Sequence, residues 1–131
     1  MPEDRVWMVR LRREAMDEVA GRLALQGGDL VFTGDRGEVT RIALASVHRV
    51  RRIWGSPVLT VVHGGPAGVE RTAFYFAQPP PLLRPDASRW DQRRTRRATV
   101  RYLGERNADL KPTIRAWVRE IREGARAARG A

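Results

Sequence analysis

The chain has 131 residues, enough for one domain with its own hydrophobic core and too few for two comfortable ones. Hydrophobic residues make up 42% of the sequence and charged residues 31%, which excludes wholesale disorder. Cysteine is absent, which excludes a disulfide framework and thiol chemistry.

The net charge of +10 comes almost entirely from arginine, since Lys111 is the one lysine among 25 basic residues. Residues 1–78 hold 11 basic and 9 acidic side chains, whereas residues 79–131 hold 14 basic and 6 acidic ones. Positive charge is therefore concentrated in the last part of the chain, where it favours an anionic partner.

The opening residues, MPEDRVWMVRLRRE, begin with acidic side chains and lack the apolar run of a signal peptide. No segment of the sequence approaches the roughly 18 consecutive apolar residues of a membrane-spanning helix. We therefore expect a cytoplasmic protein, with peripheral attachment to the inner face of a membrane as an alternative.

From residue 6 to residue 77, short apolar or alternating runs are separated by glycine-containing turns, the pattern of consecutive antiparallel strands. The expected strands are residues 6–12, 21–26, 29–34, 39–45, 48–54, 58–62 and 69–77. Between the second and third of them, Gly27 and Gly28 predict a tight hairpin. Seven short strands at roughly even spacing favour a compact antiparallel barrel or sandwich.

Prolines end this pattern in the segment QPPPLLRPD, because proline cannot join a central ladder or lie inside a regular helix. Residues 79–108 are therefore predicted to form an insertion, helical or irregular, between the strands and the last element of the domain.

The last element is predicted from its apolar spacing. Side chains of one helix face recur at Ile114, Trp117, Val118 and Ile121. This stripe predicts an amphipathic helix over residues 109–124, with Asp109 as its N-cap and Pro112 in its first turn, where proline is tolerated. Residues 125–131 have little apolar anchorage and are expected to fray.

The predicted insertion contains the stretch DQRRTRRATVRY, residues 91–102, with five arginines and one acid. On a helix these arginines share one side, opposite Tyr102 and Leu103, so the segment is either a solvated helix face or a basic binding patch. The candidate patch consists of Arg89, Arg93, Arg94, Arg96, Arg97 and Arg101, together with Trp54. For Trp54, at the end of a predicted strand, a core position is favoured over an exposed one.

Two other structures remain open for this region. The residues ATVRYL, 98–103, have the β-branched and aromatic content of an additional strand. Permissive positions three and four apart from Val100 to Ile121 would also suit a continuous coiled-coil helix, although Gly104 and Pro112 argue against it.

The order of these elements resembles the pleckstrin-homology (PH) superfold, including its GRAM and bacterial relatives. The segments that carry the resemblance are GRLAL and DLVF, VTRIALASVHRVRRI, VLTVV, RTAFYF and IRAWVREI. The resemblance implies a barrel of two near-orthogonal sheets, closed at one end by the C-terminal helix with Trp117 as the plug. Phosphoinositide-binding members place basic residues around the first strands, whereas the turn here, LQGGD, has none, so the lipid function is not carried over.

Residues suited to catalysis or metal binding are sparse. The two histidines, His48 and His63, do not form a metal-ligand spacing with a nearby acid. Ser46, Ser56 and Ser88 lie in no strand-to-helix nucleophile elbow. We therefore expect a protein that is not an enzyme and that uses neither a metal nor a cofactor.

The favoured function is a non-catalytic binding module of the PH-like type that docks a protein partner or a membrane-associated assembly. The alternative is binding of nucleic acid or of an anionic membrane surface through residues 89–101. Nucleic acid is the less favoured of these, because no aromatic pair suited to base stacking accompanies the arginines. No small-molecule substrate is expected.

Overall fold

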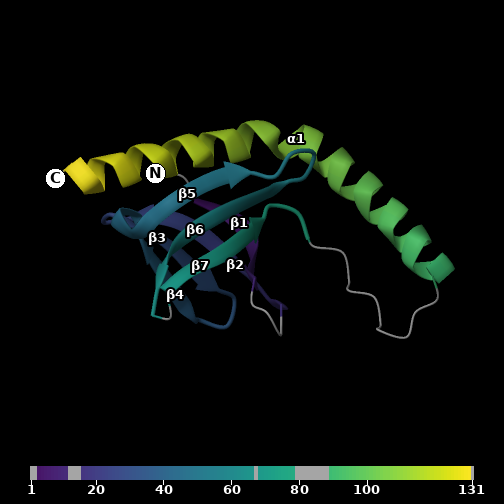
Figure 1. Cartoon of the computed structure of the whole chain (residues 1–131), viewed down its shortest axis with the longest axis horizontal. Coiled ribbons are helices and arrows are strands. Elements are labelled where there is room, and N and C mark those ends of the chain that lie inside the picture. Colours follow the sequence, from purple (N-terminus) through teal and green to yellow (C-terminus); the bar gives the residue numbers. More distant parts are fainter. Residues whose placement is uncertain (1–2, 12–15, 67, 79–88, 131) are drawn as a thin grey trace.

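The computed structural model describes residues 3–11, 16–66, 68–78 and 89–130, which form a seven-stranded antiparallel sheet and one long helix (Figure 1). The strands are β1 Glu3–Leu11, β2 Met16–Gln26, β3 Asp29–Gly34, β4 Val39–Ala43, β5 Val47–Arg52, β6 Val58–Gly65 and β7 Gly68–Tyr75. A 3₁₀ helix, η1 Leu44–Ser46, joins β4 to β5, and helix α1 spans Arg89–Gly130.

The strands follow the order β4-β3-β2-β1-β7-β6-β5 in one sheet. The pairing of β1 with β7 therefore connects the first four strands of the chain to the last three. Every pairing is antiparallel. The predicted class, mainly β with seven antiparallel strands and a C-terminal helix, is confirmed. The arrangement is compatible with a PH-like fold.

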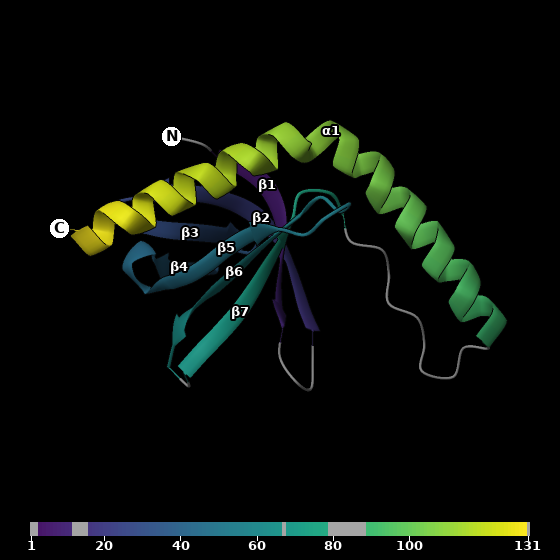
Figure 2. The ribbon, with the colours of Figure 1, turned by 45° about the horizontal axis from the view of Figure 1, so that its top comes forward.

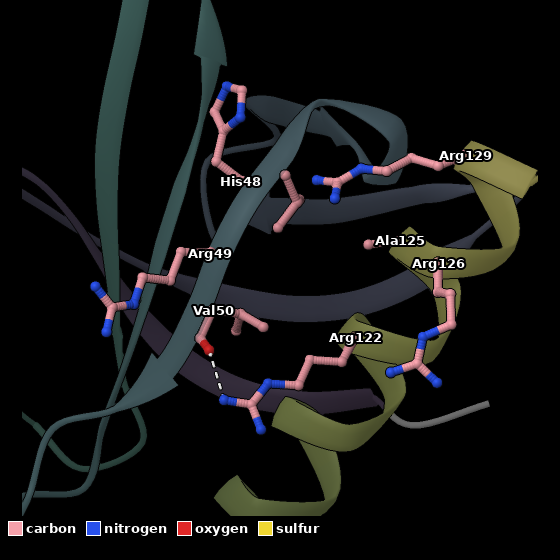
Figure 3. A pocket seen from close by; sticks show the side chains of 8 residues that line it. His48, Arg49, Val50, Arg122, Ala125, Arg126 and Arg129 are labelled. Atoms are coloured by element: carbon pink, nitrogen blue, oxygen red, sulfur yellow. Dashed lines mark hydrogen bonds between the residues drawn. The ribbon is translucent and has the colours of Figure 1, made fainter.

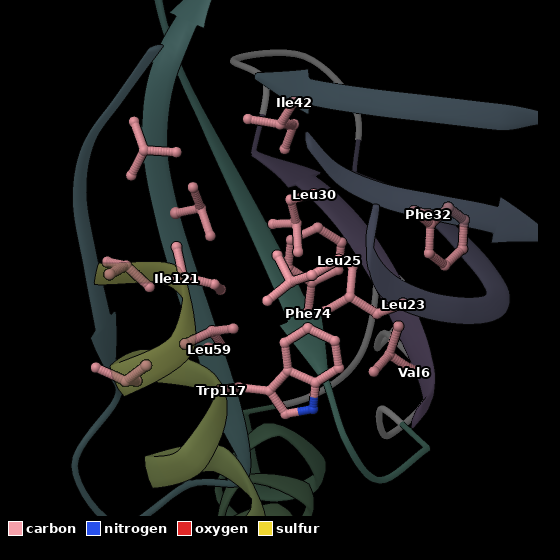
Figure 4. Packing of buried hydrophobic residues seen from close by; sticks show 14 of the residues in the cluster. Val6, Leu23, Leu25, Leu30, Phe32, Ile42, Leu59, Phe74, Trp117 and Ile121 are labelled. Atoms are coloured by element: carbon pink, nitrogen blue, oxygen red, sulfur yellow. The ribbon is translucent and has the colours of Figure 1, made fainter. Parts of the chain in front are cut away.

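One hydrophobic core lies between the inner face of the curved sheet and α1 (Figure 4). Side chains alternate between the two faces of a strand, so residues of one face reach this core. The strands contribute Val6, Met8, Leu23, Leu25, Leu30, Phe32, Ile42, Val47, Val50, Leu59, Val61 and Phe74. Because α1 adds Trp117 and Ile121 to the same cluster, strands and helix share one hydrophobic core.

The turn between β2 and β3 was predicted from two adjacent glycines, and the structure confirms it. Gln26 pairs with Asp29, so the loop has two residues. Gly27 and Gly28 have φ angles of 55° and 82°. Positive φ at both central positions is what a type I′ hairpin turn requires, and glycine adopts it without steric cost.

Trp117 closes one end of the barrel, as predicted. Its side chain is 1% exposed, and its ring lies 6.3 Å from that of Phe76, measured between centroids. The indole Nε1–H donates a hydrogen bond to Oδ2 of Asp4 on β1 at 2.7 Å. That bond satisfies a donor that burial would otherwise leave unpaired, and it ties the helix to the first strand.

The helix is longer than the sequence pattern indicated. The predicted bounds of 109–124 and the predicted fraying are wrong for residues up to 130, because α1 continues to Gly130 and Ala125 packs in the core; residue 131 lies outside the described residues. Alanine contributes little apolar surface, but it lets the helix approach the sheet closely. Its neighbour Gly124 lies so near η1 that an added Cβ would be 2.6 Å from Leu44 Cδ1.

The part of α1 before Asn107 projects beyond the sheet, and the helix bends near its middle (Figure 2). Proline removes one main-chain hydrogen bond and its ring crowds the preceding turn, which bends this helix without ending it. Of the predicted insertion, residues 89–108 are helical, so the alternative strand at 98–103 does not form; residues 79–88 lie outside the described residues. Within the described ranges, no helix combines the length and the apolar character that crossing a membrane requires.

Tyr75 makes stability depend on pH in the alkaline range. Its ring packs with Val9, Val58 and Ala73 on the outer face of the sheet, and burial, with a smaller contribution from Glu18, raises the pKa of its hydroxyl. In the unfolded chain this tyrosine ionises near pH ~10. The folded protein holds the proton to higher pH, so the unfolded state binds fewer protons there and the free energy of unfolding falls as pH rises.

We therefore expect the urea midpoint to fall between about pH 9 and about pH 11. The Tyr75→Phe variant keeps the ring but cannot ionise, so its midpoint should fall less over the same range. Equal slopes for the two proteins would show that Tyr75 titrates normally in the fold.

Candidate functional site

Strand β5 lies at the edge of the sheet and pairs only with β6. Its other edge faces α1, which runs alongside it (Figure 1). The Ile53 N–H donates to the Val58 carbonyl at 2.9 Å, so by the alternation of an antiparallel ladder the main-chain groups of Val50 and Arg52 point to the free edge. There Arg122 of α1 donates from Nη2 to the Val50 oxygen at 3.2 Å (Figure 3).

A groove runs between this free edge and the helix, and we call it the β5–α1 groove. It consists of two adjoining hollows of about 340 and 490 Å³, which share Arg122 and Arg126. The first is lined by Val47, His48, Arg49, Val50, Arg122, Ala125, Arg126 and Arg129. The second is lined by Arg51, Arg52, Arg115, Val118, Arg119, Arg122, Glu123 and Arg126.

The arginines of the helix wall come from the periodicity of α1. Apolar residues from Ile114 to Ala125 face the core, and a second stripe runs beside them with alternating spacings of four and three residues. This stripe consists of Arg115, Arg119, Arg122, Arg126 and Arg129. At 1.5 Å of rise per residue, it extends for about 21 Å along the helix. An amphipathic helix therefore places a row of cations at the rim of its own buried face.

The groove has an apolar floor and a basic rim. Val47, Val50, Val118 and Ala125 on its floor are buried, whereas the five arginines of the helix stripe are exposed. Glu123 is the one acidic residue among the lining side chains. Ion pairs in the described part of the chain lie elsewhere, for example between Arg5 and Asp35. The groove therefore carries an excess of positive charge that a bound anionic group would neutralise.

The predicted patch on residues 89–101 is placed only in part. Arg97 and Arg101 are exposed on the projecting part of α1. For Arg89, Arg93, Arg94 and Arg96 the structure describes the helical main chain and not the side chains. Binding through this patch stays a prediction.

Trp54 does not belong to the core, and the favoured interpretation of this residue was wrong. It lies in the turn between β5 and β6, with 90% of its surface exposed. The residue before it, Ile53, is also exposed, since β5 ends at Arg52. Near this turn, Arg52 Nη1 donates to Oδ1 of Asn107 at 3.0 Å and joins the end of β5 to α1.

Neither histidine lies in an arrangement suited to catalysis. His63 is buried, and its Nδ1 lies 3.0 Å from the Gly64 carbonyl oxygen. A carbonyl only accepts, so Nδ1 carries a proton, and Nε2 lies 2.9 Å from the Thr72 hydroxyl oxygen. His48 is exposed at a β-bulge of β5. Histidine and acidic side chains gather in no group of three or more within the described ranges, so those ranges offer no candidate metal centre.

Sequence reasoning missed the groove, although one signal of it was present. The arginine spacing between residues 115 and 129 matches that of the apolar stripe beside it, which marks the border of a buried helix face. Nothing in the sequence showed that this border would lie against β5. The sequence matches no protein-family model, and comparison with curated proteins gives no match.

Proposed function

We propose that the protein is a non-catalytic binding module of the PH-like type that docks an acidic segment of a partner protein in the β5–α1 groove. The observation that carries this proposal is the row of exposed arginines along the free edge of β5. The sheet of seven antiparallel strands and the helix that packs on it support the PH-like assignment at the level of fold.

The dimensions of the groove favour an extended segment. At about 3.3 Å per residue, a strand of about six residues covers the ~21 Å spanned by the arginine stripe. The free edge of β5 offers main-chain groups at Val50 and Arg52, and adding a strand to an exposed sheet edge is a known mode of peptide recognition. Arg122 would exchange its bond to the Val50 carbonyl for one to the incoming segment.

The composition of the groove favours an acidic polypeptide over a nucleic acid. A peptide with alternating side chains can place apolar groups on the floor formed by Val118 and Ala125 and carboxylates against the arginines. Nucleic-acid backbones offer phosphates but no apolar side chains for such a floor.

The test uses a peptide of about eight residues that alternates Glu with Val, with fluorescence anisotropy as the readout. We expect the Arg119→Gln/Arg126→Gln variant to bind it about tenfold more weakly, because exposed charge contacts contribute up to about 1 kcal/mol each and 1.4 kcal/mol is tenfold in Kd. Higher salt should weaken binding to the native protein more than to the variant.

The matched control is Arg97→Gln/Arg101→Gln, which removes the same charge from the projecting part of α1. It should bind the peptide within about twofold of the native protein. A peptide with Gln in place of Glu should bind neither the native protein nor either double variant. Equal losses in the two double variants would show general charge attraction, and a loss only in the control would move the site to residues 89–101.

A further inference from the structure

A second basic pocket lies on the outer face of the sheet, away from the β5–α1 groove. It is lined by Arg49, Arg51, Ile53, Thr60, Val62 and Arg71. The strand register explains how these side chains meet. Arg51 is opposite Thr60, and Val62 lies between Arg49 on one side and Arg71 on the other. Directly opposed residues of an antiparallel sheet have their side chains on the same face, so three arginines surround Thr60 and Val62.

Thr60, which lines this pocket, has a buried hydroxyl without a hydrogen-bond partner in the described part of the chain. The residue is 8% exposed, and its Oγ1 is the one buried side-chain polar atom without a hydrogen-bond partner among the described residues. Buried hydroxyls nearly always have a partner, because an unpaired one retains the cost of losing its water. The long arginine side chains around Thr60 are flexible, so a reorientation of their guanidinium groups would open a path to the hydroxyl.

The three arginines also lack a counter-charge. They are exposed, and none of them forms an ion pair with a carboxylate in the part of the chain that the structure describes. Like charges on neighbouring positions of a sheet repel each other. The pocket has a volume of about 200 Å³, below the roughly 300 Å³ at which pockets for drug-sized ligands begin. Its size and charge therefore suit a small, multiply charged anion.

We propose that this outer-face pocket binds a phosphate group, with guanidinium groups of Arg49, Arg51 and Arg71 on its oxygens and the Thr60 hydroxyl as a further donor. Phosphate is the anion that fits these groups best, because it accepts several hydrogen bonds at once and pairs with the planar fork of arginine. The inference goes beyond the proposed function, since it assigns a second ligand to the opposite side of β5.

The phosphate could belong to a small soluble molecule or to a phospholipid headgroup, and Trp54 distinguishes the two. Ile53 lines the pocket, and the next residue, Trp54, projects from the turn with 90% of its surface exposed. Tryptophan is favoured at the boundary between lipid and water. A headgroup in the pocket would bring that side chain to the membrane surface, whereas a soluble phosphate would leave it in water.

The decisive variant is Thr60→Val, which keeps the shape and the net charge of the protein. We expect it to weaken binding of inorganic phosphate at least about tenfold, because it removes the hydroxyl that donates a hydrogen bond to the charged ligand. Isothermal titration calorimetry at constant ionic strength measures the change in Kd. Thr60→Val should also raise the Tm slightly, since it removes a buried unpaired hydroxyl. Arg71→Gln should weaken phosphate binding to a similar extent.

The matched control for charge is Arg36→Gln, an exposed residue in the turn between β3 and β4 that lines neither proposed site, and it should leave phosphate binding unchanged. In a second arm, vesicles of phosphatidylcholine with or without phosphatidic acid, whose headgroup is a phosphomonoester, replace inorganic phosphate. If vesicle binding is lost in Thr60→Val and in Trp54→Ser, the pocket binds the phosphate of a lipid headgroup. If phosphate binding is lost in Thr60→Val but not in Trp54→Ser, the pocket binds a soluble phosphate. Binding of neither probe, or binding equally strong in Thr60→Val and the native protein, would overturn the proposal.

Discussion

Trp117→Ala is expected to lower the free energy of unfolding by roughly 3–5 kcal/mol, the range for deleting a large buried aromatic side chain. The substitution empties the centre of the interface between α1 and the sheet and leaves the ring of Phe76 without its partner. It also removes the hydrogen bond to Asp4, which links α1 to β1. Urea denaturation followed by far-UV circular dichroism measures the loss.

Trp117→Phe is the control for this variant. Phenylalanine keeps much of the buried apolar volume but cannot donate to Asp4, so the loss should be smaller than for alanine. Since α1 forms one wall of the β5–α1 groove, Trp117→Ala should also weaken acidic-peptide binding. A loss of stability below about 1 kcal/mol would contradict the role of Trp117 in closing the barrel.

Gly21→Ala is expected to destabilise the protein by about 3 kcal/mol, the upper part of the range for overpacking a core. Gly21 lies on the inner face of β2, opposite Val6 on β1 and Gly34 on β3. A Cβ there would come within 2.7 Å of the Phe32 ring and 2.8 Å of the Gly34 Cα, and closer still to the carbonyl oxygen of Thr33. Two of these contacts are with main chain, so a rotamer change cannot relieve them.

Gly104→Ala is the matched control, with the opposite expected sign. Gly104 is exposed inside α1, and no atom would contact an added Cβ within 4 Å. Alanine in a helix interior is favoured over glycine by roughly 0.5–1 kcal/mol, so this variant should be more stable than the native protein. Thermal unfolding of the two variants side by side measures both effects. Equal Tm shifts would show that the contacts around Gly21 do not limit packing.

Strand β5 belongs to both proposed binding sites, because a strand presents different groups in different directions. Its free main-chain edge borders the β5–α1 groove, and the side chains of Arg49 and Arg51 help to line the outer-face pocket. Substituting these two arginines would therefore disturb both sites. Arg119 and Thr60 each line only one of them, so variants at these positions separate the two functions.

Much of the fold could be predicted from local patterns. Alternation between polar and apolar residues marks the strands, and the glycine pair at residues 27–28 marks a hairpin. The spacing of Ile114, Trp117 and Ile121 identified the helix face that reaches the core. These features depend on residues close together in the chain, so the sequence displays them directly.

The length of α1 was predicted poorly, because residues that disfavour a helix cost only a small free energy, which tertiary contacts can outweigh. Gly104 costs roughly 1 kcal/mol relative to alanine, and Pro112 bends this helix without ending it. At the other end, Ala125 is anchored by the core, and Ala128 packs against it. Contacts with distant residues outweigh the low local apolarity of the last turns.

The sequence by itself indicated seven strands, the glycine hairpin and the apolar helix face that carries Trp117, because each follows from periodicity or turn chemistry within a short segment. The position of Trp117 at the end of a barrel was implied by the resemblance to the PH superfold. Only the tertiary structure decided that the arginines of α1 would line the free edge of β5, that Trp54 would be exposed, and that Thr60 would be buried without a partner. These features depend on which strand lies at the sheet edge and which side chains meet across strands. Such neighbours are far apart in the chain, and no pattern within a short segment shows that they will be close in space.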